Sequence, residues 1–191
     1  GSDFALVRRM NWEDWGVDRS ENAGDSREFL WGAAYFLHAR QFPFVESERH
    51  RLLFTLQGGI GENMDRFSQF QIGGGPAGDD FESIGRPIIP GAAIEEFNTE
   101  RYAIGAMEYR YEPWFITYIG LRGAVSYINR YRQRSSGVER SDDVLPSLGI
   151  RVTTGFLLET RLQIEYYYNA SVIRDSAYGG HELTFSVAGE F

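Results

Sequence analysis

The residues able to do acid, base or nucleophilic chemistry are few and scattered in this chain. Its 191 residues include three histidines, His38, His50 and His181, and no cysteine. Nucleophilic catalysis needs a nucleophile within hydrogen-bond reach of a base. His181 and Ser186 are five residues apart, which in a β-strand places them on opposite faces. The sequence also lacks a Gly-x-Ser-x-Gly element, so we expect no catalytic residue and no enzyme activity.

Two other patterns could hold an ion or a cofactor. Asp142 and Asp143 form an isolated acidic pair, which is typical of a solvated segment rather than of a metal site. The triplet Gly73-Gly74-Gly75 could suggest a phosphate-binding loop, but no Gly-Lys-Ser/Thr follows it. The net charge of −8 argues against binding of nucleic acid. We therefore expect no metal, no cofactor and no nucleic-acid partner.

The strongest structural signal is the alternation of apolar and polar residues at the carboxy-terminal end, residues 182–191. A strand of about ten residues that is apolar on one face and polar on the other has the length and pattern of a membrane-spanning β-strand. The final aromatic residue is typical of the closing strand of an outer-membrane barrel. The expected closing-strand signal consists of Leu183, Phe185, Val187 and Phe191.

Seven further segments alternate in the same way, and together they predict an eight-stranded antiparallel sheet. The second of the eight is expected to carry Trp31, Ala33, Tyr35 and Leu37 on its apolar face. The predicted strands cover residues 4–15, 29–41, 49–60, 101–111, 114–130, 145–157, 160–169 and 182–191.

The connections alternate between long and short. Long polar connections are expected at 16–28, 61–100, 131–144 and 171–180, and short ones at 42–48, 112–113 and 158–159. Long connections at one rim and short ones at the other are typical of outer-membrane barrels, whose short turns are periplasmic. An even number of strands then leaves both termini at the periplasmic rim.

A soluble lipocalin-like ligand-binding barrel would show the same alternation with its apolar face inward, and it remains the alternative fold. Tyr and Trp residues gather near segment ends, as in an interfacial belt. The polar face carries charges of both signs, which can neutralise one another in a narrow lumen. The expected lumen charges are Glu108, Arg110, Arg122, Arg151, Arg161 and Glu165.

These patterns predict an all-β protein, an eight-stranded antiparallel up-and-down transmembrane β-barrel with a long extracellular third loop. The barrel is expected to take in residues 4–191 as one domain. Residues 1–3 are expected to be a tag remnant or terminus, because Gly1-Ser2 looks like a cloning remnant.

Short motifs lie around the third loop: Phe70 with Ile72-Gly73-Gly74, and Glu108-Tyr109-Arg110-Tyr111 in the strand that follows. Five predicted strands lie between this loop and the end of the chain. In order and spacing, residues 70–191 resemble the carboxy-terminal half of the bacterial surface antigen barrels. This superfamily includes the Bam and Tam insertases, two-partner secretion transporters and patatin-associated barrels.

The resemblance implies an integral outer-membrane protein of a Gram-negative bacterium, without periplasmic modules. It would be a minimal eight-stranded member of the superfamily or an excised half of a larger barrel. The implied roles are assistance in membrane-protein insertion, through a seam between the first and last strands, and anchoring of a partner domain such as a patatin-like hydrolase. A small-barrel lipid-modifying enzyme is the alternative. The implied partners are outer-membrane lipid or lipopolysaccharide, the barrel-assembly machinery through the carboxy-terminal strand, and client outer-membrane proteins.

The third loop of this superfamily usually carries an Arg-Gly-aromatic tip that docks inside the barrel against an acidic residue. In this chain Asp79-Asp80 precede Phe81, and Arg86 is the candidate for the arginine role. Because the interior of an eight-stranded barrel is only wide enough for side chains, we expect the loop to cap the outer mouth with at most its tip inside. The expected loop motif is Gly73, Gly74, Gly75, Phe81, Gly85 and Arg86.

Overall fold

The computed structural model describes residues 1–8, 28–64, 68–75, 86–134, 137–156, 160–174 and 177–189. These residues form strands and irregular segments without a helix, so the predicted all-β class is confirmed. Accordingly, no membrane-spanning helix is found in the described part of the chain. The strands are β1 (Ser2–Arg8), β2 (Glu28–Gln41), β3 (His50–Glu62), β4 (Phe70–Ile72), β5 (Phe97–Thr99), β6 (Arg101–Trp114), β7 (Thr117–Arg134), β8 (Gly137–Phe156), β9 (Thr160–Arg174) and β10 (Ala177–Gly189).

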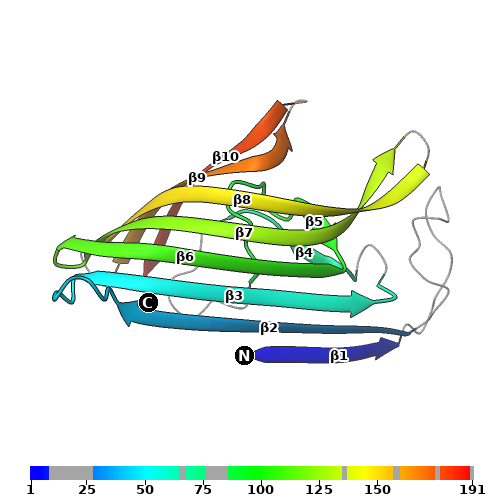
Figure 1. Ribbon diagram of the computed structural model, residues 1–191, viewed down its shortest axis with the longest axis horizontal. Coiled ribbons are helices and arrows are strands. Elements are labelled where there is room, and N and C mark those ends of the chain that lie inside the picture. The colour runs from blue at the N-terminus through cyan, green and yellow to red at the C-terminus, as the bar shows by residue number, and fades with distance from the viewer. Residues whose placement is uncertain are drawn as a thin grey trace.

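Eight of these strands form one large antiparallel sheet, as the alternation predicts. Its order is β1-β2-β3-β6-β7-β8-β9-β10, so neighbours in the sheet are neighbours in the chain apart from the insertion of β4 and β5 (Figure 1). β4 and β5 pair with each other in a separate two-stranded sheet within the third connection. The predicted number and order of the long strands are therefore confirmed.

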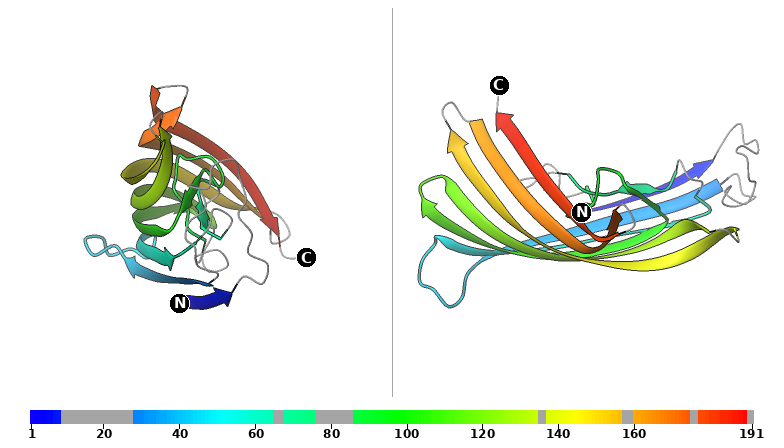
Figure 2. Two further views of the ribbon diagram at one scale, coloured as in Figure 1. Left: turned by 90° about the vertical axis from the view of Figure 1, so that its right-hand side faces the viewer. Right: turned by 90° about the horizontal axis from the view of Figure 1, so that it is seen from above.

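The eight-stranded sheet is strongly curved, and the third connection lies on its concave side (Figure 2). Within the described residues, β1 pairs only with β2 and β10 pairs only with β9. The expected hydrogen-bonded ring is thus not observed, and the sheet is an open trough with two free edges. β1 begins at Ser2, within the range 1–3 expected to be a tag or terminus, and residues 9–15 of the first predicted strand lie outside the described residues.

Two of the segments predicted to be long connections, 131–144 and 171–180, instead consist mostly of strand. Most of 131–144 continues β7 and β8, which stay paired as far as Arg134 and Gly137, and most of 171–180 continues β9 and β10. The apolar alternation fades in these segments, but their backbones continue the hydrogen-bonded ladder. Because β8 pairs with β9 only from Ser147 onward, the end of the β7–β8 hairpin projects from the sheet (Figure 1). We call residues 130–141 the β7–β8 arm.

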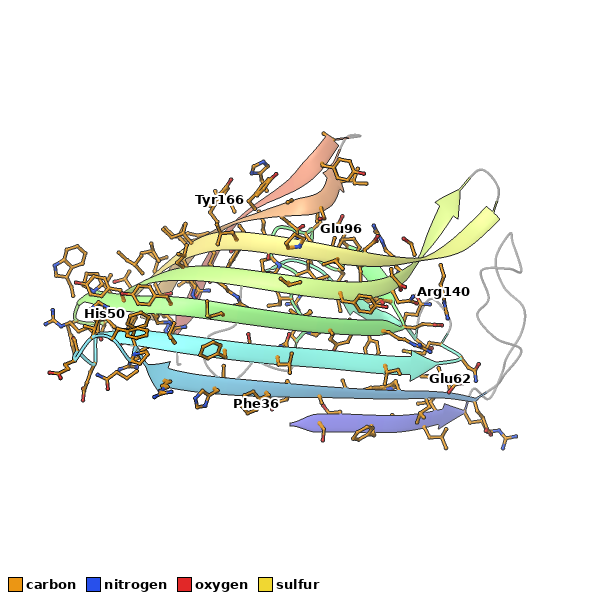
Figure 3. All side chains as sticks on the ribbon, viewed as in Figure 1. Phe36, His50, Glu62, Glu96, Arg140 and Tyr166 are labelled. Carbon is orange, nitrogen blue, oxygen red and sulfur yellow. The ribbon has the colours of Figure 1, made fainter. Side chains whose placement is uncertain are left out.

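The convex face of the trough is apolar and exposed. Alternate residues of every long strand point there, and their large side chains have no cover: Leu56 is 59% exposed, Leu148 58% and Phe185 67%. Figure 3 views this face and labels Phe36 of β2 and Tyr166 of β9. The exposed apolar residues include Phe4, Leu6, Leu30, Phe36, Phe54, Leu56, Ile60, Met107, Ile119, Leu121, Val125, Val144, Leu148, Ile150, Val152, Ile164, Leu183, Phe185 and Val187.

The face assigned to β2 from the sequence is wrong. Trp31 and Ala33 border a cavity of about 390 Å³ together with Phe70 of the third connection, which places their side of the strand on the concave face. Phe36, on the opposite side, is 59% exposed. This strand is apolar on both faces because its concave side packs against the third connection, so alternation alone could not orient it.

The buried core lies between the third connection and the concave face, near the ends of the strands that carry the long connections. Ile72, Ile89, Ala92 and Phe97 of the connection pack against five residues of the sheet, Tyr102, Ile104, Ile128, Leu145 and Val172. The expectation that this loop only caps the mouth is therefore wrong for its described part. An open trough has room for a folded segment that a closed eight-stranded ring lacks.

Candidate functional site: the charged concave face and the loop anchor

A buried ion-pair network occupies the middle of the concave face. The carboxylate of Glu108 on β6 accepts hydrogen bonds from Arg151 Nη2 of β8 at 2.5 Å and from Arg110 Nε at 3.1 Å. Arg151 Nη1 lies 3.8 Å from Glu165 Oε1 of β9. The side chains of Arg151 and Glu108 are 4% and 6% exposed, so neither charge is solvated. The alternation predicted from the sequence places the six expected lumen charges on one face of the sheet. Four of them meet in this network: Glu108, Arg110, Arg151 and Glu165.

Glu165 has two further hydrogen bonds that complete its environment. Tyr167 Oη donates to Glu165 Oε1 at 3.1 Å, and Thr184 Oγ1 of β10 donates to Glu165 Oε2 at 3.2 Å. Glycine makes space for the network on the neighbouring strands. A Cβ at Gly120 would lie 2.7 Å from Glu108 Oε1, and one at Gly149 would lie 2.0 Å from the ring of Tyr167.

The other two expected lumen charges lie at the margin of the network. Arg122 is the register partner of Glu108, but its buried Nε makes no hydrogen bond within the described structure. Arg161 is on the same face of β9 as Glu165, four residues away, and its side chain is exposed. Both residues lie on the concave face of the sheet, outside the centre of the network.

A second arrangement attaches the third connection to the last strand. The carboxylate of Glu182 on β10 accepts hydrogen bonds from the backbone N–H of Gly75 at 2.5 Å and of Gly91 at 2.8 Å. Asn169 Nδ2 of β9 donates to the carbonyl of Pro90 at 3.1 Å. We call these contacts the loop anchor. The sequence identified Gly75 and placed Glu182 on the polar face of the last strand, but it gave no sign of their contact, because the two residues are 107 positions apart.

The expected loop motif is only partly assembled by this anchor. Gly73, Gly74 and Gly75 are buried at it, whereas Arg86 is exposed and contributes its backbone carbonyl to Gln57 Nε2. No contact of the Arg86 guanidinium with an acidic residue is seen in the described structure. Phe81 and Gly85 of the motif, and Phe191 of the closing-strand signal, lie outside the described residues. Leu183, Phe185 and Val187 lie on the exposed convex face.

The glycines of the anchor allow close backbone approach, which gives a direct test. A Cβ at Gly74 would lie 1.9 Å from the carbonyl oxygen of Ala92 and 2.5 Å from Glu182 Oε1. We expect Gly74→Ala to lower the free energy of unfolding by about 2 kcal/mol, as overpacking of a tight site does, and to speed proteolysis of the loop. Gly105→Ala is the matched control, since nothing lies within 4 Å of its Cβ position. Equal urea midpoints for the two variants would contradict the anchor.

The three histidines lie on the convex face, where His38 stacks on Phe36 and the other two lie beside a tyrosine. His50 Nδ1 is 2.6 Å from Tyr109 Oη at the β2–β3 end of the sheet, and His181 Nδ1 is 2.8 Å from Tyr166 Oη near the β9–β10 hairpin. His181 and Ser186 are on opposite faces of β10, as their spacing predicts. Among the described residues, no group of three or more His, Asp or Glu could hold a metal ion.

Charges at the base of the β7–β8 arm are paired. Arg130 Nε lies 2.5 Å from Asp143 Oδ2, and Arg140 pairs with Glu100, which precedes β6. Burial raises the pKa of Glu100 above its ordinary value, and the positive charges of Arg140 and Arg101 act in the opposite direction. These pairs connect the arm to the rim of the trough.

Comparisons of the chain with known protein families, with curated proteins and with solved structures find no match.

Proposed function

We propose that this chain is the wall of an integral β-barrel of a bacterial outer membrane, with its convex face against lipid and its third connection inside the lumen. The observation that carries the proposal is the distribution of polarity. Glu108, Arg151 and Glu165 are buried on the concave face, whereas large apolar side chains are exposed on the convex face. A lipocalin-like barrel in water has the opposite distribution, and an exposed apolar surface of this extent is an interaction surface.

The height of the apolar surface supports contact with a bilayer. On β7 the convex face is apolar from Ile119 to Val125, and Tyr127 follows. Eight steps of about 3.3 Å from Ile119 to Tyr127 span about 26 Å along the strand. At the tilt of about 40° usual in membrane barrels, this becomes about 20 Å along the membrane normal, close to the height of about 25 Å of their apolar bands.

Aromatic side chains border this surface at both ends, as in an interfacial belt. At the end with short turns, the His50 ring stacks on Tyr111 with centroids 4.8 Å apart, and Trp114 is 71% exposed. Near the β9–β10 hairpin, the Tyr168 ring lies 5.0 Å from His181, and Tyr178 is 78% exposed. Each belt thus combines aromatic rings with a polar group, which suits the boundary between lipid tails and headgroups.

The proposed role is non-enzymatic, in the assembly or secretion of other outer-membrane proteins. It is supported by the resemblance of residues 70–191 to the surface antigen barrels and by the edge strands β1 and β10, because a seam formed by them can open to accept a further strand by β-augmentation. Folding of an unrelated outer-membrane protein into vesicles should be faster when this protein is present. An unchanged folding rate would contradict the assembly role while leaving the membrane wall unaffected.

The membrane wall itself is tested by labelling single-cysteine variants, which the cysteine-free chain makes simple. Phe185→Cys on the convex face and Thr184→Cys on the concave face are neighbours on β10. With an environment-sensitive fluorophore and refolding into vesicles, we expect the label at 185 to be blue-shifted and to be quenched several-fold more strongly by brominated lipid chains. A chain that folds in plain buffer, or equal quenching at both positions, would contradict lipid contact.

A further inference from the structure

The third connection crosses the trough from the first strands to the last one. Near β2 the ring of Phe70 packs edge-on against Trp31, with centroids 5.9 Å apart. Near β10, Gly75 and Gly91 are held by Glu182. Two backbone runs between these ends, residues 72–75 and 88–92, are fully buried. The described part of the connection therefore spans the concave face from β2 to β10 (Figure 2).

A closed ring of eight strands has no space for such a segment. Its interior is just wide enough for the side chains of its own wall or for one small ligand. Here the concave face already carries the buried network of Glu108, Arg151 and Glu165, and the described part of the connection packs against the same face. A barrel that encloses both needs a wider wall, with strands added between β1 and β10.

The two free edges define what those added strands must be. β1 and β10 are the first and last of an even number of antiparallel strands, so they run in opposite directions. Both edge strands turn their apolar residues to the convex face. Phe4 and Leu6 of β1 are exposed there, and so are Leu183 and Phe185 of β10. The missing strands must be even in number, antiparallel, and apolar on the same outer face.

We propose that a second copy of this chain supplies them, so that two troughs close into one barrel of sixteen strands, eight from each. A two-fold axis along the barrel pairs β1 of each copy with β10 of the other, in the antiparallel direction that both edges require. One symmetry operation thus covers both edges with the same contact, and the two convex faces form a continuous apolar band. Each copy keeps its own third connection on its side of the shared lumen. This inference rests on the proposed membrane wall.

The edge contact is tested by disulfide formation between β1 and β10. Ala5 of β1 and Thr184 and Ser186 of β10 alternate with the exposed apolar residues and so face the lumen. Ala5→Cys is combined with Thr184→Cys in one variant and with Ser186→Cys in another, which samples two registers. Each variant is refolded in detergent and oxidised. The control is Thr117→Cys with Thr154→Cys, whose native hydroxyls are 3.0 Å apart within one chain.

We expect at least one β1–β10 variant to run as a covalent dimer on a non-reducing gel, and the control to run as a monomer. Light scattering of the unmodified protein in detergent should give twice the chain mass of 21.8 kDa. A fast-running oxidised monomer would show that the chain closes on itself and would overturn the inference. So would a monomeric mass without cross-links. Quenching of the label at position 185 by brominated lipid distinguishes either result from failure of the membrane wall.

Discussion

Glu182→Ala is expected to detach the third connection from the last strand and to lower the free energy of unfolding by about 3 kcal/mol. The carboxylate is the acceptor for the N–H groups of Gly75 and Gly91, and both glycines are buried. Hydrogen bonds to a charged group contribute about 1.5–3 kcal/mol each, and a buried donor left without an acceptor is costly. Urea unfolding of the refolded protein measures the loss, and limited digestion with proteinase K, read by mass spectrometry, reports release of the loop.

Two variants on the same strand separate the anchor from a general effect on β10. Thr184→Ala removes one hydrogen bond to Glu165 and leaves the loop contacts intact, so we expect a loss of about 1 kcal/mol and no faster digestion of the loop. Glu182→Gln keeps one carbonyl oxygen as an acceptor and should fall between the two. If Glu182→Ala matches Thr184→Ala in both measurements, Glu182 does not hold the loop.

Arg151→Met should be at least as damaging, with a loss of about 4 kcal/mol. Its guanidinium is the positive partner of both Glu108 and Glu165, and all three side chains are buried. Removing one partner of a buried ion pair typically costs about 3–5 kcal/mol, because the other charge stays buried without compensation. The measurement is again urea unfolding, with recovery of the heat-modifiable folded band on a gel as a second readout.

The matched control for Arg151 is Arg161→Met, the same substitution at an exposed arginine on the same face. We expect it to change the free energy of unfolding by at most about 0.5 kcal/mol. Glu108→Gln combined with Arg151→Met should be less destabilised than the sum of the two single variants, because it removes both charges of one pair. Strict additivity in this cycle would show that the pair does not couple.

The long strands could be predicted from sequence because successive residues of each strand point alternately to the apolar convex face and to the polar concave face. Leu183, Phe185 and Val187 lie on one face of β10 for that reason, and so do Glu108, Arg110, Arg151 and Glu165 on the opposite face of the sheet. The pattern failed on β2, where Trp31 is apolar but faces inward. It also failed beyond residue 130, where the strands stay paired although the sequence no longer alternates between apolar and polar residues.

The loop anchor could not be predicted from any local pattern. Glu182 looks like any other polar residue of the alternating last strand, and its partners Gly75 and Gly91 are 107 and 91 positions away. The expected loop motif includes Gly75 but not Gly91. It placed the expected arginine contact at Arg86, whereas the structure uses an acidic side chain of the wall and backbone N–H groups of the loop. Only tertiary packing brings these groups together.

In the proposed membrane wall, the β7–β8 arm is the part of the protein that the surroundings of a cell would meet first. Its strands continue about five residues past Asn129, or about 17 Å at the usual rise of a strand, and the ion pairs Arg130–Asp143 and Glu100–Arg140 brace its base. On an outer membrane, the arm would extend into the sugar layer of the lipopolysaccharide. It would offer antibodies and bacteriophages a charged epitope whose sequence can vary without disturbing the wall below.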